Sequence, residues 1–174
     1  MQLADDGTVV QASAKAKQLT YGGMLNLRSL IVHQAHYYVG IMSTITARYS
    51  FKRRQFNGRD GAEYPEALII QYQKQNEKVV PAISYSWMTL LAYNQIQAIY
   101  YKYQTELDKY QVDPKSGNPF PILADLHGIV SGFKALSTWD GEKYAEILKQ
   151  ACGGHGFMHI SGLSRIHTDF GFGF

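Results

Sequence analysis

Cysteine is nearly absent from this sequence, because Cys152 is the single one among 174 residues. One thiol excludes an intrachain disulfide and a zinc site built from this chain's own thiolates. The excess of positive over negative charge is also small: the sequence has 17 lysines and arginines and 14 aspartates and glutamates, which gives a formal net charge of +3. So small a surplus is far from the basic surface of a dedicated nucleic-acid binder, and no nucleic-acid partner is expected.

No charged residue occurs between Val79 and Tyr101, and an uncharged run of that length raises the question of a membrane span. The run nevertheless contains amide and hydroxyl side chains, among them Ser84, Ser86 and Asn94. Such groups are costly in hydrocarbon, whereas a helix buried in a bundle accommodates them. We therefore expect a bundle helix here and no transmembrane segment.

Apolar residues recur at helical spacing in long blocks, and no segment alternates apolar and polar residues as a half-buried strand does. The first block ends at NGRDGAEYP, residues 57–65, which predicts a turn. The second begins at Pro65, a residue suited to a first helical turn, and Pro81 should kink it. Prolines and a glycine in residues 112–121 predict a loop before the third block. The predicted helices cover residues 22–56, 65–110, 122–137 and 141–151.

These elements predict an all-α protein of long antiparallel helices packed as a bundle, with almost no sheet. Three long helices leave one side of a four-helix bundle uncovered, and an exposed apolar stripe needs a partner. The expected organisation is an extended lead-in over residues 1–21, a helical bundle domain over 22–151 and a glycine-rich, cofactor-contacting tail over 152–174. The bundle is thus expected to be incomplete by itself.

The most specific string in the sequence is QACGGHGFMHISGLSRI, residues 150–166. Four other strings precede it, in the order LTYGGMLNLRS, ARYSFKRRQF, IIQYQKQNEKVVP and LHGIVSGFKALSTW. Each resembles a segment of the acyl-CoA oxidases, and the five follow one another in the same order as in that family. A lone GGHG would be weak, but five ordered matches span most of the chain. The resemblance implies an incomplete C-terminal helical bundle of the acyl-CoA dehydrogenase type.

The string ARYSFKRRQF carries the family pattern Tyr-Ser-x-x-Arg-x-Gln-Phe, here with Arg53, Gln55 and Phe56. The resemblance implies that this arginine, at the end of a helix, pairs with the pyrophosphate of FAD, usually across a dimer interface. A guanidinium suits that role because its planar fork donates two hydrogen bonds to phosphate oxygens. The alternative for residues 52–54 is a solvated basic helix end, which the helix dipole favours.

The resemblance also places the glycine-rich segment beside the adenosine end of FAD, with Gln150, Gly153, Gly154 and Gly156 as cofactor contacts. Glycines let backbone N–H groups approach a ligand closely. The plainer explanation is a helix C-cap followed by a turn, which accounts for Gly153 but not for the SGL continuation. Arg28 matches a family arginine near the substrate end of the site, and its alternative is a plain surface charge.

Histidines are the remaining candidates for chemistry. His33 and His36 lie one helical turn apart, so a metal pair is conceivable. The sequence contains no Glu-x-x-His pair, which argues against a di-iron bundle, and packed or surface histidines are the interpretation we favour. No Gly-x-Ser-x-Gly elbow or Walker-type phosphate loop occurs either. We assign no metal ligand and no catalytic nucleophile.

The resemblance implies an FAD-dependent oxidation of fatty acyl-CoA to trans-2-enoyl-CoA, with O2 reduced to H2O2, as in fatty acid β-oxidation. The family's catalytic glutamate lies in a Glu-Gly motif shortly after the glycine-rich segment, and this sequence ends at HTDFGFGF before such a residue. A general base must reach the proton that it removes. We therefore expect the chain not to be active alone and assign it no catalytic residue.

Two interpretations remain open at this point. In the first, the chain is one part of a working oxidase, completed by other acyl-CoA oxidase segments or subunits in a dimer or larger complex, with fatty acyl-CoA as substrate. In the second, it is a noncatalytic structural subunit that derives from the same fold and packs into a larger assembly through its open side. The resemblance implies a peroxisomal location, with a mitochondrial assembly as the alternative.

Overall fold

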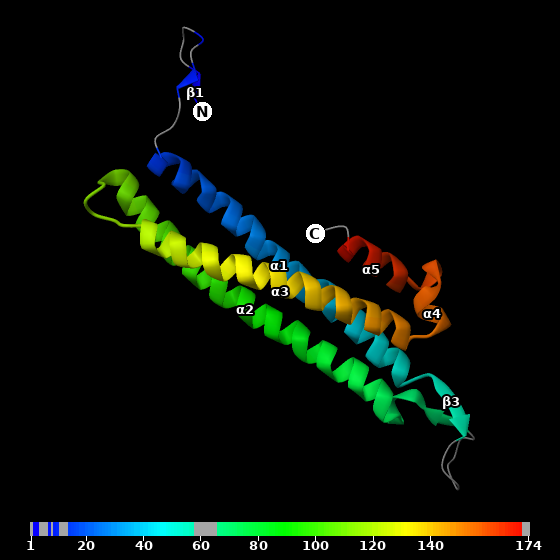
Figure 1. Cartoon of the computed structure of the whole chain (residues 1–174). Helices are drawn as coiled ribbons and strands as arrows, with labels where there is room; N and C mark the ends of the chain where they lie inside the picture. Colours follow the sequence, from blue (N-terminus) through cyan, green and yellow to red (C-terminus); the bar gives the residue numbers. More distant parts are fainter. Residues whose placement is uncertain (1, 4–6, 8, 11–13, 58–65, 172–174) are drawn as a thin grey trace.

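The computed structural model describes residues 2–3, 7, 9–10, 14–57 and 66–171. Three long helices account for most of them: α1 (Ala14–Ser50), α2 (Gln73–Val112) and α3 (Phe120–Ala151). They lie side by side in an elongated bundle, in which α1 and α3 run in one direction and α2 runs in the other (Figure 1). At a rise of about 1.5 Å per residue, α2 alone is roughly 60 Å long. The mainly helical class predicted from the sequence is confirmed.

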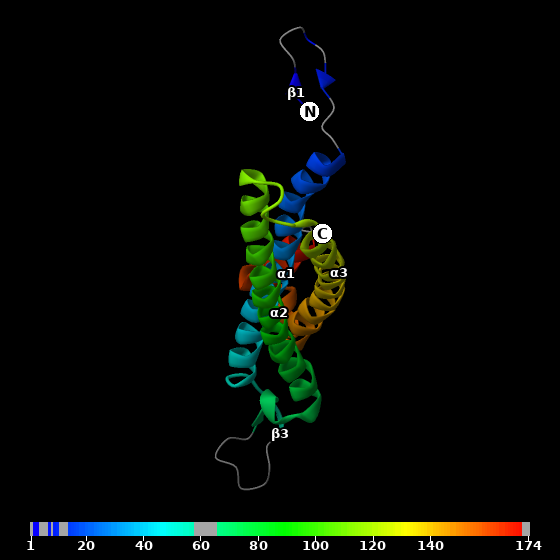
Figure 2. The ribbon, with the colours of Figure 1, turned by 90° about the vertical axis from the view of Figure 1, so that its left-hand side faces the viewer.

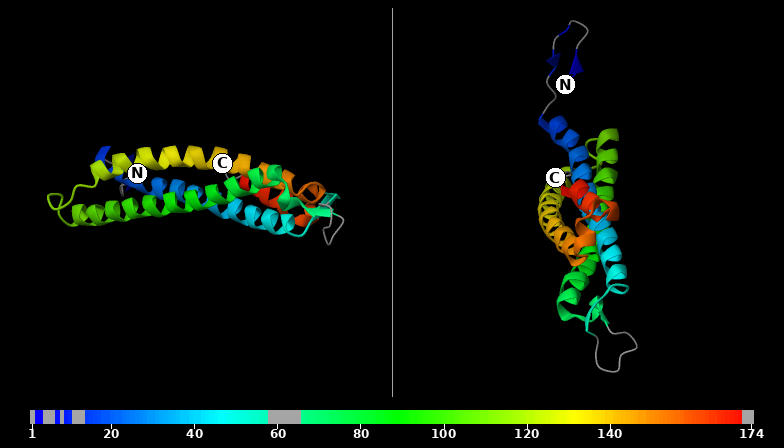
Figure 3. Two further views of the ribbon diagram at one scale, coloured as in Figure 1. Left: turned by 90° about the horizontal axis from the view of Figure 1, so that it is seen from below. Right: turned by 90° about the vertical axis from the view of Figure 1, so that its right-hand side faces the viewer.

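Two short helices follow the long ones, α4 (Gly154–Phe157) and α5 (Leu163–Gly171), with a 3-10 turn at His159–Ser161 between them. The chain reverses after α3, so α5 folds back and contacts both α1 and α3 (Figures 2 and 3). Phe170, near the end of α5, is buried in the core with its ring centroid 5.5 Å from that of Tyr38 on α1. All five helices thus pack together.

The core consists of two clusters of buried side chains, one in each half of the bundle. The cluster under α5 is built on Met42, Tyr85, Leu148, Leu163 and Phe170. The cluster in the other half is built on Leu25, Val32, Ile96, Tyr103 and Leu126. Complete burial of such a side chain contributes on the order of 1.5–3 kcal/mol, so each cluster holds the long helices together over its own half.

Several helix boundaries differ from the prediction. Residues 14–21 are helical and not extended, because α1 begins at Ala14. α1 ends at Ser50 and not at residue 56, since the backbone then turns into a strand. α2 begins at Gln73 and not at Pro65, which lies outside the described residues. As predicted, this helix continues past Pro81.

α3 is one continuous helix across the break that was predicted after Ser137. Gly141, at which the next helix was predicted to begin, lies where α3 meets other elements. A Cβ atom at this position would lie 2.6 Å from the ring of Phe170 and 3.1 Å from the hydroxyl oxygen of Tyr85. The glycine therefore permits close packing and does not end the helix.

Strands are few and short, as predicted. β1 (Gln2–Leu3) pairs with β2 (Val9–Val10), and β3 (Arg54–Asn57) pairs with β4 (Glu66–Leu68), both antiparallel, the second with an irregular register. A 3-10 turn at Ile69–Gln71 leads from β4 to α2. The turn predicted at 57–65 falls, from residue 58 on, outside the described residues. The loop predicted at 112–121 is confirmed, since α2 ends at Val112 and α3 begins at Phe120.

Large apolar side chains remain exposed on the bundle, as an uncovered side requires. Examples on α2 are Trp87, Met88 and Leu91, which are 61%, 55% and 62% exposed. No helix in the described part of the chain has an apolar stretch that is long enough to cross a membrane.

Candidate functional site

A hollow of about 240 Å³ lies at the end of the bundle where α1 and α3 finish and α2 begins. Its walls come from three places in the sequence: the segment after α1, the first turns of α2, and the turn after α3. Five of the residues predicted from the resemblance line it together, namely Arg53, Gln55, Phe56, Gln150 and Gly153. The two motifs, about 100 residues apart in the sequence, thus face one space.

The resemblance placed Arg53 at the end of a helix. In the structure it lies three residues beyond the end of α1. Its backbone N–H donates to the carbonyl oxygen of Tyr49 (2.8 Å), and its own carbonyl oxygen accepts from the N–H of Ile69 (3.0 Å). The side chain is exposed, and its guanidinium has no hydrogen-bond or ion-pair partner among the described residues. The backbone is thus fixed at both groups while the charge remains free for a ligand.

Gln55 and Phe56 follow on β3. Phe56 has a positive φ of 63°, which is uncommon for a residue with a side chain. Its ring packs edge-on against that of Tyr72, with 6.2 Å between centroids, and the hydroxyl of Tyr72 donates to the carbonyl oxygen of Gln55 (3.0 Å). Tyr72, which the sequence analysis missed, therefore fixes this wall and also lines the hollow.

The opposite wall is the turn after α3. Gly153 has φ 58° and ψ −138°, a conformation that only glycine adopts readily, and its N–H donates to the carbonyl oxygen of Gln150 (2.9 Å). A Cβ there would meet nothing within 4 Å, so the backbone faces open space. The side-chain nitrogen of Gln150 donates to the Glu146 carboxylate (2.8 Å). The side-chain oxygen Oε1 of Gln150 can therefore act as a hydrogen-bond acceptor beside the hollow.

The other two predicted glycines do not line the hollow. Gly154 begins α4 and is exposed. Gly156 is buried against the backbone of α3, and a Cβ there would collide with the carbonyl oxygen of Lys149. Gly156 therefore allows α4 to pack against the end of α3. The sequence alone does not show whether a glycine is needed for such packing or for contact with a ligand.

Three positively charged side chains line the hollow. Lys74 and Lys78 line it with Arg53, and the sequence analysis missed both lysines. Lys74 forms an exposed ion pair with Glu77 (2.7 Å), whose hydrogen bond lowers the pKa of the Glu77 carboxyl and raises the pKa of the lysine. The first N–H groups of α2 also lie at this end, and a helix N-terminus favours anions.

Cys152, the lone thiol, lines the hollow but its side chain is buried, with 1% of the residue exposed. Burial raises the pKa of the thiol, and the Sγ–H contacts Thr46 Oγ1 at 3.5 Å. A neutral, buried thiol is not a reactive nucleophile.

Arg28 lies far from the hollow, 22 residues before the end of α1 or roughly 30 Å along the helix. Its guanidinium donates to Ser131 Oγ (3.2 Å) and lies 5.4 Å from the ring centroid of Tyr21. The structure thus separates Arg28 from the other predicted site residues and gives it intramolecular partners. No group of three or more histidine, cysteine, aspartate or glutamate side chains with metal-binding geometry occurs within the described residues.

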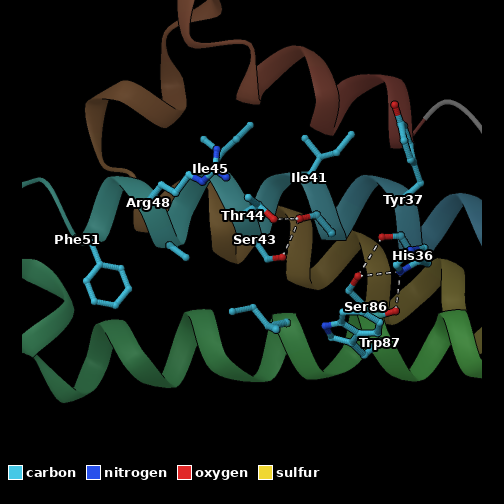
Figure 4. Close-up of a pocket in the computed structure, with 13 residues that line it drawn as sticks. His36, Tyr37, Ile41, Ser43, Thr44, Ile45, Arg48, Phe51, Ser86 and Trp87 are labelled. Atoms are coloured by element: carbon cyan, nitrogen blue, oxygen red, sulfur yellow. Dashed lines mark hydrogen bonds between the residues drawn. The ribbon is translucent and has the colours of Figure 1, made fainter.

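A larger groove of about 670 Å³ runs between α1 and α2 and contains none of the predicted residues (Figure 4). Its walls are mainly apolar, including Ile41, Phe51 and Trp87. His36 and Ser86 close one part of it, where the imidazole Nδ1 lies 2.8 Å from the carbonyl oxygen of Ser86 and 3.0 Å from its Oγ. These bonds join α1 to α2. Among the described residues that line the groove, exposed Arg48 is the single lysine or arginine.

Comparisons with known proteins show the family to which the chain is related. Residues 21–172 match the family described as "Acyl-CoA oxidase, C-alpha1 domain". The chain is 34% identical over 171 residues to peroxisomal acyl-coenzyme A oxidase 1 of Phascolarctos cinereus, a match that covers 97% of this chain and 24% of that protein. The chain therefore spans about a quarter of the length of the relatives it matches.

Solved structures of complete oxidases contain the same fold. Arabidopsis thaliana acyl-CoA oxidase 1 superposes with a TM-score of 0.83 at 26% identity, over 98% of this chain and 24% of that one. Acyl-CoA oxidase-1 of Caenorhabditis elegans, solved in complex with FAD and ATP, superposes with a TM-score of 0.76 at 29% identity, over 98% and 23% of the two chains.

Proposed function

Since this chain belongs to the acyl-CoA oxidase family, as a C-alpha1 domain, we propose that it forms the diphosphate-binding end of an FAD site in an acyl-CoA oxidase. In that role it is not active alone. The complete enzyme would convert fatty acyl-CoA to trans-2-enoyl-CoA and reduce O2 to H2O2. The remaining three quarters of the relatives' length, in the same or another polypeptide, would supply the rest of the flavin and substrate sites.

The observation that carries this proposal is the meeting of Arg53, Gln150 and Gly153 around one hollow. Their motifs are about 100 residues apart in the sequence, and a shared binding site explains why both line the same hollow. The donors suit a diphosphate: an exposed guanidinium with no partner among the described residues, two lysines, of which Lys74 also pairs with Glu77, and the N-terminus of a 40-residue helix. FAD carries such a diphosphate between its flavin and its adenosine.

When bound, FAD would accept the hydride that the oxidation removes, and this chain's residues would hold the cofactor and not react. Arg53 would grip phosphate oxygens with two N–H groups. Gly153 would offer backbone without a side chain in the way, and the free amide oxygen of Gln150 would accept a hydrogen bond from an amino or hydroxyl group of the adenosine. The hollow is open, so a neighbouring subunit or segment would cover the ligand's other side.

The second candidate function is a noncatalytic structural subunit, and the apolar groove between α1 and α2 is the observation that favours it. A groove with Phe51 and Trp87 each 61% exposed is suited to bury a partner's apolar surface. The two functions are compatible in one fold, because groove and hollow occupy different surfaces. A structural subunit, however, does not require an arginine and a glycine turn that line the same hollow.

We propose a peroxisomal location, because the relatives matched over nearly the whole chain are named as peroxisomal oxidases. A mitochondrial assembly is the alternative. A fluorescent fusion of the protein in its own cells, compared with peroxisomal and mitochondrial markers, decides between the two compartments.

The test of the cofactor site is a titration of the ¹⁵N-labelled 174-residue chain with FAD and, separately, with ADP. Both ligands should shift the backbone NMR signals of Arg53, Gln150 and Gly153, since both carry the diphosphate. The signals of Leu25 and Val130, in the other half of the bundle, serve as the internal reference. Shifts confined to the groove around Trp87, or no shift at millimolar ligand, would count against the proposed site.

A further inference from the structure

Gln75 lies at the point where all three walls of the hollow meet. It belongs to the first turn of α2, and its side-chain nitrogen Nε2 donates to two acceptors on different helices. One is Oγ of Ser50, the last residue of α1, at 2.9 Å, and the other is the carbonyl oxygen of Ala151, the last residue of α3, at 3.0 Å. A side-chain amide has two hydrogens, so both are engaged.

Both acceptors are themselves fixed. Ser50 is fully buried, and its hydroxyl donates to the carbonyl oxygen of Thr46 at 2.7 Å, so its oxygen is oriented to accept from Gln75. The carbonyl oxygen of Ala151 is one of the last four of α3, which have no partner within the helix. Gln75 therefore pairs the carbonyl oxygen at the end of α3 and adds a second hydrogen bond to the buried hydroxyl of Ser50.

Each acceptor lies a few residues before a residue that lines the hollow. Arg53 comes three residues after Ser50, and Gly153 comes two residues after Ala151. At such short separations the chain has little freedom, so the position of each acceptor sets the position of the residue that follows it. One side chain thus bonds to the helix end that precedes Arg53 and to the helix end that precedes Gly153.

We propose that Gln75 is a positioning residue that sets the distance between Arg53 and the glycine turn, and so the fit of the hollow to a diphosphate ligand. The role of Gln75 in ligand binding rests on the proposed FAD site. Its effect on the positions of Arg53 and Gly153 does not, because the two hydrogen bonds of Gln75 are present without ligand. Gln75 acts through its two neighbours and needs no contact with the ligand.

The structure supplies a matched control at the other end of the bundle. Gln97, also on α2, donates from Nε2 to Oγ of Ser29 on α1 at 2.8 Å, and Ser29 is 1% exposed. Gln97→Met removes the same kind of glutamine–serine bond between the same two helices, about 33 Å along α2 from Gln75. The replacement is the same, but both Nε2 contacts of Gln97, to Ser29 and to Oδ1 of Asn26 at 3.5 Å, are on α1 and far from the hollow.

The experiment compares Gln75→Met, Gln97→Met and the unmodified chain by two measurements. In the protein without ligand, Gln75→Met should shift the NMR signals of both Arg53 and Gly153, and Gln97→Met should leave both in place. In a titration, Gln75→Met should weaken ADP binding by about tenfold while adenosine, which lacks phosphates, is affected much less. Gln97→Met should leave ADP binding unchanged, even if it lowers the midpoint of thermal unfolding as much as Gln75→Met does.

Ser50→Ala provides a second route should Gln75→Met fold poorly. It removes one of the two acceptors and leaves the bond to Ala151 intact, so Arg53 should shift and Gly153 should not. The proposal is overturned if Gln75→Met leaves the Arg53 and Gly153 signals unmoved, or if both glutamine variants weaken ADP binding equally. If the unmodified chain binds neither ADP nor FAD while the wall signals still move, the cofactor site fails and the positioning by Gln75 stands.

Discussion

Tyr49 and His155 join the first helix to the glycine-rich segment across 106 residues of sequence: the tyrosine hydroxyl lies 3.3 Å from Nδ1 of the imidazole. Their rings also pack, with 5.5 Å between centroids. The carbonyl oxygen of Tyr49 accepts the N–H of Arg53. One residue therefore holds the arginine segment by its backbone and the glycine-rich segment by its side chain, which couples the two walls of the hollow.

Replacement of Arg53 by alanine should weaken FAD or ADP binding by roughly tenfold or more, since a charge-assisted contact to phosphate is lost. Arg54→Ala is the matched control. It removes the same charge one residue away, where the guanidinium donates to the carbonyl oxygen of Glu66 and does not line the hollow. Isothermal titration of both variants measures the difference, and equal affinities would refute the assignment of Arg53.

Gly156→Ala should lower the free energy of unfolding by about 2 kcal/mol or more, because the new Cβ collides with the backbone carbonyl of Lys149 and α4 must move. Gly154→Ala should change it by less than about 0.5 kcal/mol, since no atom lies within 4 Å of the new methyl group. Urea unfolding of the two variants gives both values. Equal destabilisation would mean that α4 does not pack against α3 as described.

Cys152 should react slowly with a thiol reagent such as DTNB in native buffer, because burial raises the pKa of the thiol and hides the sulfur. As the only cysteine, it reports unfolding without interference. Labelling should become fast and stoichiometric above the urea midpoint. Rapid labelling at low urea would show that the end of α3 opens locally.

The stability of the protein should depend on acid pH through Glu146. Hydrogen bonds from Lys149 and then Gln150 lower the pKa of the Glu146 carboxyl. A lowered folded pKa contributes stability above the unfolded glutamate value of about 4.3, and that contribution is lost as the pH falls through the folded pKa. His167 faces the same carboxylate at 3.2 Å, on the other side of the contact.

Glu146→Gln tests this dependence. The unmodified chain should be the more stable of the two at pH 7, by a small amount because the carboxylate is partly exposed, and the difference should shrink as the pH falls below about 4. Urea midpoints across this pH range measure it. A difference that is independent of pH would exclude ionisation of Glu146 as its cause.

The sequence predicted the helical class and the loop between α2 and α3, because apolar periodicity and proline-rich segments are local signals. It misplaced the start of α2, since Pro65 is suited to a first helical turn but Glu66–Leu68 pair with β3. It also predicted a gap between helices at residues 138–140, where α3 is continuous and the adjacent Gly141 packs against Phe170 and Tyr85. Glycine permits a turn and close packing equally, and only the tertiary neighbours decide.

The same limit applies to the candidate site. Arg53 and Gly153 were predicted because each lies in a specific motif, and the structure brings them to one hollow. Lys74 and Lys78 were missed, since two lysines on an exposed helical turn have no pattern of their own. Gln75 lies within a string that resembles the family, but nothing in the string shows that its amide reaches two other helices.

The continuity of α3 over 32 residues has a consequence for how this chain can vary in length. Each residue of an α-helix turns the chain by about 100°, so removing one residue between Pro119 and Gly153 would swing the glycine turn to another side of the bundle, away from Gln75. The segment 113–119, which joins α2 to α3, is not helical, so a change in its length does not rotate the residues that follow in this way. Natural length variation should therefore collect in that connection, while the three long helices keep their spacing to the residue.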